Sequence, residues 1–266
     1  MATMSRGRSV ALAAMALTSL ACALPDEDDD DGVDVSSDAI VGGSETLERP
    51  EVGAFRHGGT LCTGTLVAPN VVLTAAHCVP SMKDEDVSTA EPAWVFDVTA
   101  RAASAGGAAA DRVTHRFKVA RIHALPVASD FDGTQRWRRK DIALLRLADD
   151  VPASVARPAG IASRRPRLGG DVAVYGYGCT DRAKDANGRR PGSGTKRKKE
   201  YRWSLGLWAG FGDTQNLCPG DSGGPLLDVE RSAVFGVHSG YVNGDDAFGD
   251  VPANRAAILT TIAAWR

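Results

Sequence analysis

The stretch CPGDSGGPL, residues 218–226, decides how the rest of the chain is interpreted. Five of its nine residues are glycine or proline. Glycine adopts backbone conformations that other residues avoid, and proline lacks a backbone N–H donor, so this run cannot form an ordinary strand or helix. We expect an irregular loop that presents Ser222 as a nucleophile.

A serine hydroxyl is a weak nucleophile unless a base removes its proton, and that base needs an orienting partner. Of the five histidines in the chain, His77 lies where an apolar stretch runs into small residues and a cysteine. Asp141 stands at the head of the apolar run IALLRL. A carboxylate buried there requires a hydrogen-bond donor, which an imidazole N–H would supply. His77 and Asp141 are therefore the expected base and orienting acid.

The sequence around this loop consists of short apolar runs separated by Pro, Gly, Asn and Asp, a pattern typical of all-β sandwiches and barrels. We expect strands at 65–68, 71–76, 94–100, 117–122, 142–147, 172–177 and 233–238. A helix is expected at 253–265, where the apolar positions return with a helical period.

Three motifs occur in the order His, Asp, Ser: TAAHC at 74–78, DIALL at 141–145 and GDSGGP at 220–225, preceded by IVGG at 40–43. Together they resemble the chymotrypsin and trypsin family of serine proteases over residues 40–266. The resemblance implies an all-β fold of two packed antiparallel β-barrels, at about 40–150 and 151–266, with a C-terminal α-helix. The serine also fits the G-x-S-x-G motif of α/β-hydrolases, but that fold needs its acid and histidine after the serine.

The resemblance assigns roles to the residues of these motifs. Ser222 would attack the scissile carbonyl, His77 would accept its proton, and Asp141 would hold the imidazole. The backbone N–H groups of Gly220 and Ser222 would form the oxyanion hole. Asp221 would pair with the new α-amino group of Ile40, which makes the chain a zymogen activated by cleavage before Ile40.

Four cysteines besides Cys22 allow three disulfide pairings, and an exported protein is expected to form them. The resemblance implies a Cys62–Cys78 bridge that braces His77. The remaining pair is then Cys179–Cys218. This second pair departs from the vertebrate enzymes, in which the cysteine near the serine bonds to a later one.

Substrate preference follows less directly from the resemblance. Counting back from Ser222 places Asn216 at the floor of the specificity pocket, and a neutral Asn cannot alone balance a buried cation. The resemblance places Ser239, Gly240 and Tyr241 along the substrate, and Asp250 at the back wall of the pocket. An acid at Asp250 would favour Arg or Lys before the cleaved bond, with small or medium apolar residues as the alternative.

The first 39 residues differ from the rest in composition. Arg6 and Arg8 precede an apolar run over 10–24, which is the pattern of a signal peptide, assigned here to 1–23. Residues 24–39 form an acidic propeptide or linker. Cleavage before Cys22 with lipid attachment there is the alternative. Both readings predict export, to the extracellular space or the cell envelope.

The expected partners are protein or peptide substrates and an activating protease, and we expect a monomer without metal or organic cofactor. The basic segment 182–199 lacks the aromatic residues of a nucleic-acid platform, so it predicts a solvated loop and no nucleic-acid partner. The acidic cluster 84–86 predicts a solvated turn rather than a calcium loop. The competing function is a catalytically silent protease homologue that acts as a binding protein.

Overall fold

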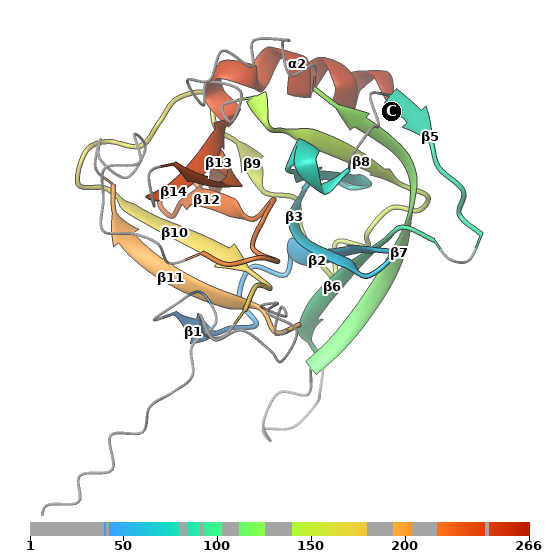
Figure 1. Cartoon of the computed structure of the whole chain (residues 1–266), viewed down its shortest axis with the longest axis horizontal. Helices are drawn as coiled ribbons and strands as arrows, with labels where there is room; N and C mark the ends of the chain where they lie inside the picture. The colour runs from blue at the N-terminus through green and yellow to red at the C-terminus, as the bar shows by residue number, and fades with distance from the viewer. Residues whose placement is uncertain are drawn as a thin grey trace, which may run out of the picture. The chain divides into compact units, whose positions relative to one another are not determined.

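A computed structural model of the chain describes residues 40, 43–79, 84–90, 93–102, 112–125, 140–179, 194–203, 217–242 and 245–266. The predicted signal peptide, the acidic segment, Cys22 and Asn216 lie outside the described residues. The described part consists mainly of strands in two sheets, with one α-helix, α2 (Figure 1). It contains no helix long and apolar enough to cross a membrane.

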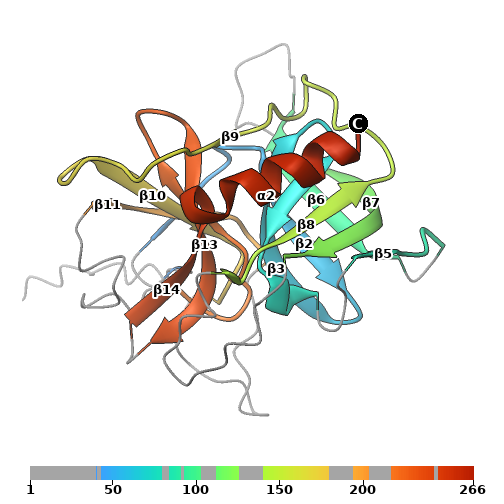
Figure 2. The same cartoon turned by 90° about the horizontal axis from the view of Figure 1, so that it is seen from above.

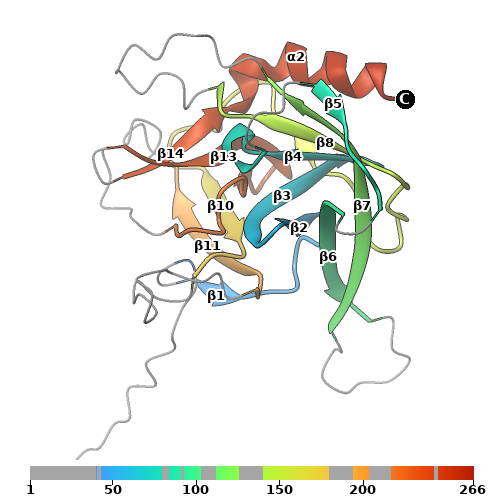
Figure 3. The ribbon, with the colours of Figure 1, turned by 45° about the vertical axis from the view of Figure 1, so that its right-hand side comes forward.

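The first sheet closes on itself as a barrel. Its strands lie in the order β5-β7-β6-β2-β3-β4-β8, and β7 also pairs with β8, so six of the strands form a ring (Figure 3). Their bounds are β2 Val52–His57, β3 Thr60–Ala68, β4 Val71–Thr74, β5 Asp84–Asp86, β6 Val95–Arg101, β7 Arg112–Ala124 and β8 Ala143–Leu147. Every pairing in this sheet is antiparallel.

The second sheet has the order β1-β11-β10-β12-β13-β14, and its described strands do not close into a ring. Their bounds are β1 Ser44–Glu45, β9 Gly160–Ile161, β10 Asp171–Gly176, β11 Arg197–Arg202, β12 Pro225–Asp228, β13 Ala233–Val242 and β14 Asp245–Asp250. The short strand β9 pairs with β13 in parallel, which is an exception to the antiparallel pattern.

Helix α2 (Val251–Ala264) packs over the region where the two sheets meet (Figure 2). Its N-cap is Asp250, whose side chain accepts a hydrogen bond from the N–H of Ala253 and so caps the first turn. Ile258 and Ile262 are buried in an apolar cluster that contains residues of both sheets. The helix therefore fastens the two halves to each other.

Each predicted strand corresponds to a strand of the structure, but seven strands were not predicted: β1, β2, β5, β9, β11, β12 and β14. The prediction of a solvated loop over 182–199 was wrong at its C-terminal end, because Arg197–Lys199 begin β11. Lys196 there is 2% exposed, and its ammonium group donates to the carbonyl of Arg49. The cluster 84–86 forms β5 rather than a turn, because it pairs with β7.

Candidate active site

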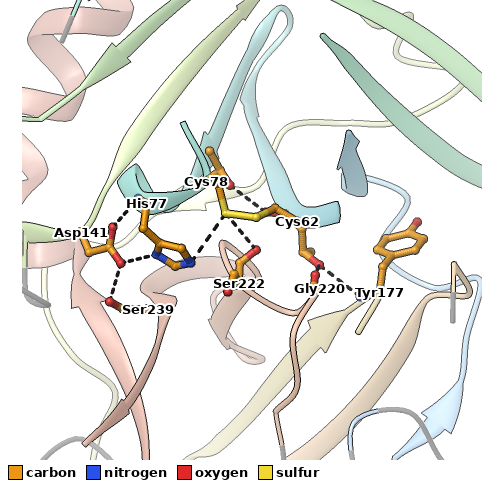
Figure 4. Close-up of a disulfide and its surroundings, with 10 residues drawn as sticks. Cys62, His77, Cys78, Asp141, Tyr177, Gly220, Ser222 and Ser239 are labelled. Carbon is orange, nitrogen blue, oxygen red and sulfur yellow. Dashed lines mark hydrogen bonds and ion pairs between the residues drawn. A yellow bond between two sulfur atoms is a disulfide. The ribbon is translucent and has the colours of Figure 1, made fainter. Parts of the chain in front are cut away.

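The three residues of the predicted triad come from both sheets. His77 lies in the 3-10 helix η1 (Ala76–Cys78), which follows β4. Asp141 lies just before β8, and Ser222 lies in the turn before β12. In Figure 4 the imidazole ring of His77 stands between Asp141 and Ser222. The structure therefore brings together the three residues that the sequence motifs singled out.

The carboxylate of Asp141 holds His77 at two points. Its Oδ1 accepts the backbone N–H of His77 at 2.9 Å, and its Oδ2 lies 2.7 Å from Nδ1 of the ring. Asp141 is 1% exposed, whereas the His77 side chain is 38% exposed. Burial raises the pKa of Asp141, but the hydrogen bonds and the charge of His77 outweigh it and hold the pKa below its ordinary value. The carboxylate is thus ionised and fixes the Nδ1–H tautomer of the ring.

Ser239 is a third partner of this carboxylate. Its Oγ donates to Asp141 Oδ2 at 2.5 Å, and this hydrogen bond also lowers the pKa of Asp141. The family resemblance places Ser239 along the substrate but gives no sign of its contact with Asp141. The two residues are 98 positions apart in the chain, and no local pattern signals that they meet.

Ser222 is partly buried in the turn before β12, and the ring of His77 faces it (Figure 4). Its carbonyl oxygen accepts the N–H of Thr63 at 2.7 Å, so strand β3 fixes the backbone of the nucleophile. No hydrogen bond between Ser222 Oγ and Nε2 of His77 is present among the described residues. Such bonds are often long without substrate and shorten in the reacting complex.

Thr63 also organises the loop before the nucleophile. Its hydroxyl donates to the carbonyl of Gly220 at 2.8 Å and accepts the N–H of Tyr177 at 3.1 Å. Gly220 has a φ of 105°, a conformation that favours glycine, and a Cβ there would lie 2.8 Å from Cα of Gly178. The backbone around the predicted oxyanion hole therefore requires glycine. Thr63 was not predicted, because the sequence around it contains no motif.

Asp221 is fully buried beside the nucleophile. Its Oδ1 accepts the N–H of Gly178 and its Oδ2 accepts the N–H of Cys218, both at 2.7 Å. Its pKa is raised to about 7: burial is the main cause and the charge of Asp246 adds to it, while the two N–H groups oppose the rise. A Cβ on Gly176 would lie 1.9 Å from Oδ1, so both Gly176 and Gly178 are shaped around this carboxylate.

Ile40, the predicted activation residue, is fully buried in the second sheet's apolar cluster, which also contains Leu217 and Leu226. Its φ of 50° is unusual for a β-branched residue and marks a bend in the chain. No ion pair reaches Asp221 within the described part of the chain. The side chain of Ile40 thus belongs to the same apolar cluster as Leu217, which precedes the nucleophile loop.

Both disulfides implied by the resemblance are present. Cys62 and Cys78 are joined with their Cα atoms 6.3 Å apart, and Cys179 and Cys218 with theirs 5.5 Å apart. The sulfur of Cys78 lies 3.9 Å from Nε2 of His77 (Figure 4). One bridge therefore braces the histidine and the other braces the loop before Ser222.

The predicted specificity residues are only partly brought together. Ser239, Gly240 and Tyr241 lie on β13, and Gly240 stands at a bulge with a φ of 133°. The carboxylate of Asp250 caps α2 and pairs with Arg165 at 2.7 Å.

A different acid, Asp246, lies opposite Tyr241 on β14 and is 3% exposed. Its Oδ1 accepts the N–H of Leu217 at 3.4 Å. Asp246 was not among the residues predicted from the sequence. The described residues contain no group of three or more His, Cys, Asp or Glu side chains arranged to hold a metal ion.

Two mainly antiparallel sheets with His77, Asp141 and Ser222 gathered between them define the chymotrypsin fold class. Solved structures agree: neuropsin, a serine protease of mouse brain, matches with a TM-score of 0.59 at 18% identity, covering 84% of this chain and 99% of neuropsin. The atomic-resolution structure of HBP matches with the same score and identity and covers 96% of HBP. These similarities establish the fold.

The family model for Trypsin matches residues 40–261, and the chain belongs to this family of serine proteases. Trypsin epsilon of Drosophila erecta is 29% identical, over 91% of this chain and 93% of the relative. Phenoloxidase-activating enzyme 1 of Spodoptera litura is also 29% identical, over 87% and 68%. Human Kallikrein-2 is 26% identical, over 85% and 87%.

Proposed function

We propose that this protein is an exported serine endopeptidase that hydrolyses peptide bonds through an acyl-enzyme. Ser222 Oγ attacks the carbonyl carbon while His77 Nε2 accepts the hydroxyl proton, and the same proton then passes to the leaving amine. Asp141 stabilises the imidazolium that forms in between. Water, activated by His77, releases the acyl group in the second half of the reaction.

The observation that carries this proposal is the pairing of a buried, ionised Asp141 with His77 Nδ1 at 2.7 Å, with Ser222 on the other side of the ring. The backbone N–H groups of Gly220 and Ser222 are assigned to the developing oxyanion, where each donor supplies about 3–4 kcal/mol in comparable sites. The ionised carboxylate of Asp141 stabilises the positively charged imidazole of His77 in the transition state more than it stabilises the neutral imidazole in the ground state.

The test is labelling of the mature chain by a fluorophosphonate probe, followed by assay of casein hydrolysis. Labelling and hydrolysis are expected in the wild type, and both are lost in Ser222→Ala but retained in a control with the exposed serine changed, Ser154→Ala. A folded, cut chain that neither labels nor hydrolyses would favour the competing function, a catalytically silent binding protein.

We further propose that the chain is a zymogen. A carboxylate that is fully buried without a cation is costly, and Asp221 has only N–H partners among the described residues. Cleavage before Ile40 would create an α-amino group that can pair with it. Because the cut follows Ala39, the activating protease does not require a basic residue there. Zymogen status is tested by comparing activity before and after cleavage at this bond.

Residues 1–23 are proposed as the signal peptide and 24–39 as the acidic propeptide, with a lipid at Cys22 as the alternative. Mass spectrometry of the exported protein identifies its N-terminal residue and so distinguishes simple secretion from lipid attachment. A mass increase of a diacylglycerol on Cys22 supports the anchor, whereas an N-terminus at residue 24 supports simple secretion.

Substrate preference is proposed to depend on Asp246 rather than Asp250. Asp246 lies across from Tyr241 on the strand that follows Ser239, whereas the carboxylate of Asp250 is engaged by Arg165. A buried acid at this place favours Arg or Lys before the cleaved bond. A panel of chromogenic peptides tests this: Asp246→Asn should lose the preference for basic residues, and Asp250→Asn should keep it.

A further inference from the structure

A cavity of about 270 Å³ lies beside the β2–β3 hairpin, outside the site described above. It is lined by Arg56, His57, Gly58, Gly59, Thr60, Leu61, Ala93, Val95 and Arg116, a set called the hairpin pocket below. None of these lining residues is acidic. The ring of His57 stacks on the ring of Trp94 with their centroids 3.8 Å apart, and this contact supports one wall of the pocket.

The hairpin pocket carries more positive charge than its nearest carboxylate can balance. Asp97, whose side chain is 7% exposed, receives two hydrogen bonds from Arg116, at 2.7 and 3.0 Å. This bidentate pair already satisfies the buried carboxylate. Arg56 lies 3.4 Å from the same group and is 39% exposed, so it adds a second cation to a single anion. Lys118 lies in the same cross-strand row, since Val95 pairs with both Arg56 and Lys118.

Strand β3 runs between Thr63, which contacts the backbone of Ser222, and Thr60 and Leu61, which line the hairpin pocket. The N–H of Thr63 points away from β2 and donates to the carbonyl of Ser222. Backbone groups in a strand alternate with a period of two, so the N–H and C=O of Leu61 point the same way. Strand β4 pairs with β3 only from Thr65 onward, and no other strand of the described part pairs with this side of Leu61, so the edge there can accept an extended peptide.

We propose that the hairpin pocket binds an acidic side chain of the substrate within the first three residues after the cleaved bond. This inference rests on the proposed endopeptidase function. The part of the substrate before the bond is assigned to β13, in the second sheet, so the part after it leaves along β3. Two residues of strand span about 6.6 Å, which brings the leaving segment from Thr63 to Leu61 at the pocket.

Charge selects the occupant. An Asp or Glu side chain would meet the guanidinium of Arg56 at the partly exposed mouth, whereas Lys or Arg at the same place would be repelled. The gain is limited because the pocket is open to water, and an exposed ion pair changes kcat/KM by about three- to fivefold. The preference for an acidic side chain also weakens with salt, since the electrostatic screening length falls to about 3 Å at about 1 M salt.

The test uses peptides that differ only after the cleaved bond, with Glu, its isostere Gln, or Lys at the second or third position. The kcat/KM ratio of the Glu to the Gln peptide is expected to be about three to five at low salt and about one at 1 M salt. In Arg56→Gln the Glu-to-Gln ratio of kcat/KM falls to about one, whereas Arg56→Lys keeps most of the preference for the Glu peptide. The matched control is Arg202→Gln, an exposed arginine of the second sheet, which keeps the wild-type ratio.

A binding measurement separates this inference from the proposed function. The processed Ser222→Ala chain does not turn over, and fluorescence anisotropy of labelled Glu and Gln peptides on it reports the pocket alone. Tighter binding of the Glu peptide supports the pocket even if no peptide is ever cleaved. Equal binding of the two peptides, or a preference that survives Arg56→Gln, overturns it and leaves Arg56 and Arg116 as structural partners of Asp97.

Discussion

The hydroxyl of Ser239 donates to Oδ2 of Asp141 at 2.5 Å, and this bond joins the second sheet to the first. Asp141 precedes β8 of the closed barrel, and Ser239 lies on β13 of the other sheet. The same carboxylate holds His77. The orientation of the histidine therefore depends on both sheets keeping their relative position, which α2 and the shared apolar cluster secure.

Ser239→Ala should lower kcat/KM by about tenfold, because one hydrogen bond to a charged group is worth roughly 1.5–3 kcal/mol and water replaces part of it. The loss should appear mainly in kcat if the bond acts through Asp141 and His77. Steady-state kinetics with a short peptide measures it, with Ser154→Ala as the exposed control. A change confined to KM would instead show that Ser239 acts only on substrate binding.

The pKa of about 7 for Asp221 predicts how the stability of the uncut chain depends on pH. A carboxyl whose pKa is raised on folding binds a proton more tightly in the folded state, so stability falls as pH rises from about 4 to 7 and is then constant. Between pH 5 and 8 this amounts to roughly 2–3 kcal/mol. Urea unfolding of uncut Ser222→Ala, with and without Asp221→Asn, measures it.

The chain that carries both Ser222→Ala and Asp221→Asn should not lose stability as the pH rises. Parallel pH curves for the two variants would contradict the raised pKa of Asp221. Cleavage before Ile40 should reverse the sign. An ion pair with the new amine lowers the pKa of Asp221, so its stabilising contribution is present above about pH 4. The same ion pair raises the pKa of the amine above its ordinary value of about 8, so the contribution declines as the pH rises from about 8 through that raised pKa.

Gly178→Ala should abolish activity and destabilise the fold by about 2–3 kcal/mol, because the added Cβ would lie 2.4 Å from the Asp221 carboxylate. Gly169→Ala is the control, since its Cβ would meet nothing within 4 Å and only its φ of 76° is unfavourable. Thermal unfolding and fluorophosphonate labelling report the two effects. An active Gly178→Ala enzyme would show that Asp221 is free to move.

Removing the Cys62–Cys78 bridge by a double Cys→Ala change should cost about 3 kcal/mol, because the bridge closes a loop of 16 residues. Activity should fall as well, since the bridge braces the segment that carries His77. Denaturant unfolding gives the first value, and kcat of the surviving folded fraction gives the second. Full activity at unchanged stability would rule out a bracing role.

The sequence predicted the residues that short motifs contain and missed those that only the fold brings together. His77, Asp141 and Ser222 lie in compact motifs, and the strands around them have clear apolar runs. Strand β11 was missed because Arg197–Arg202 are mostly charged, and propensity cannot show that Tyr201 and its neighbours pair with β10. Thr63 and Asp246 gave no local signal, and the contact of Ser239 with Asp141 gave none either, since the partners are distant in the chain.

The most direct test of the central claim is the rate at which a fluorophosphonate modifies the intact protein, followed by mass spectrometry and peptide mapping. After cleavage before Ile40 we predict one modification, on Ser222, at a rate at least about 100-fold higher than in the uncut chain, the effect of forming the oxyanion hole. Ser222→Ala and His77→Ala should show none. Modification elsewhere, or equal rates before and after cleavage, would contradict the account.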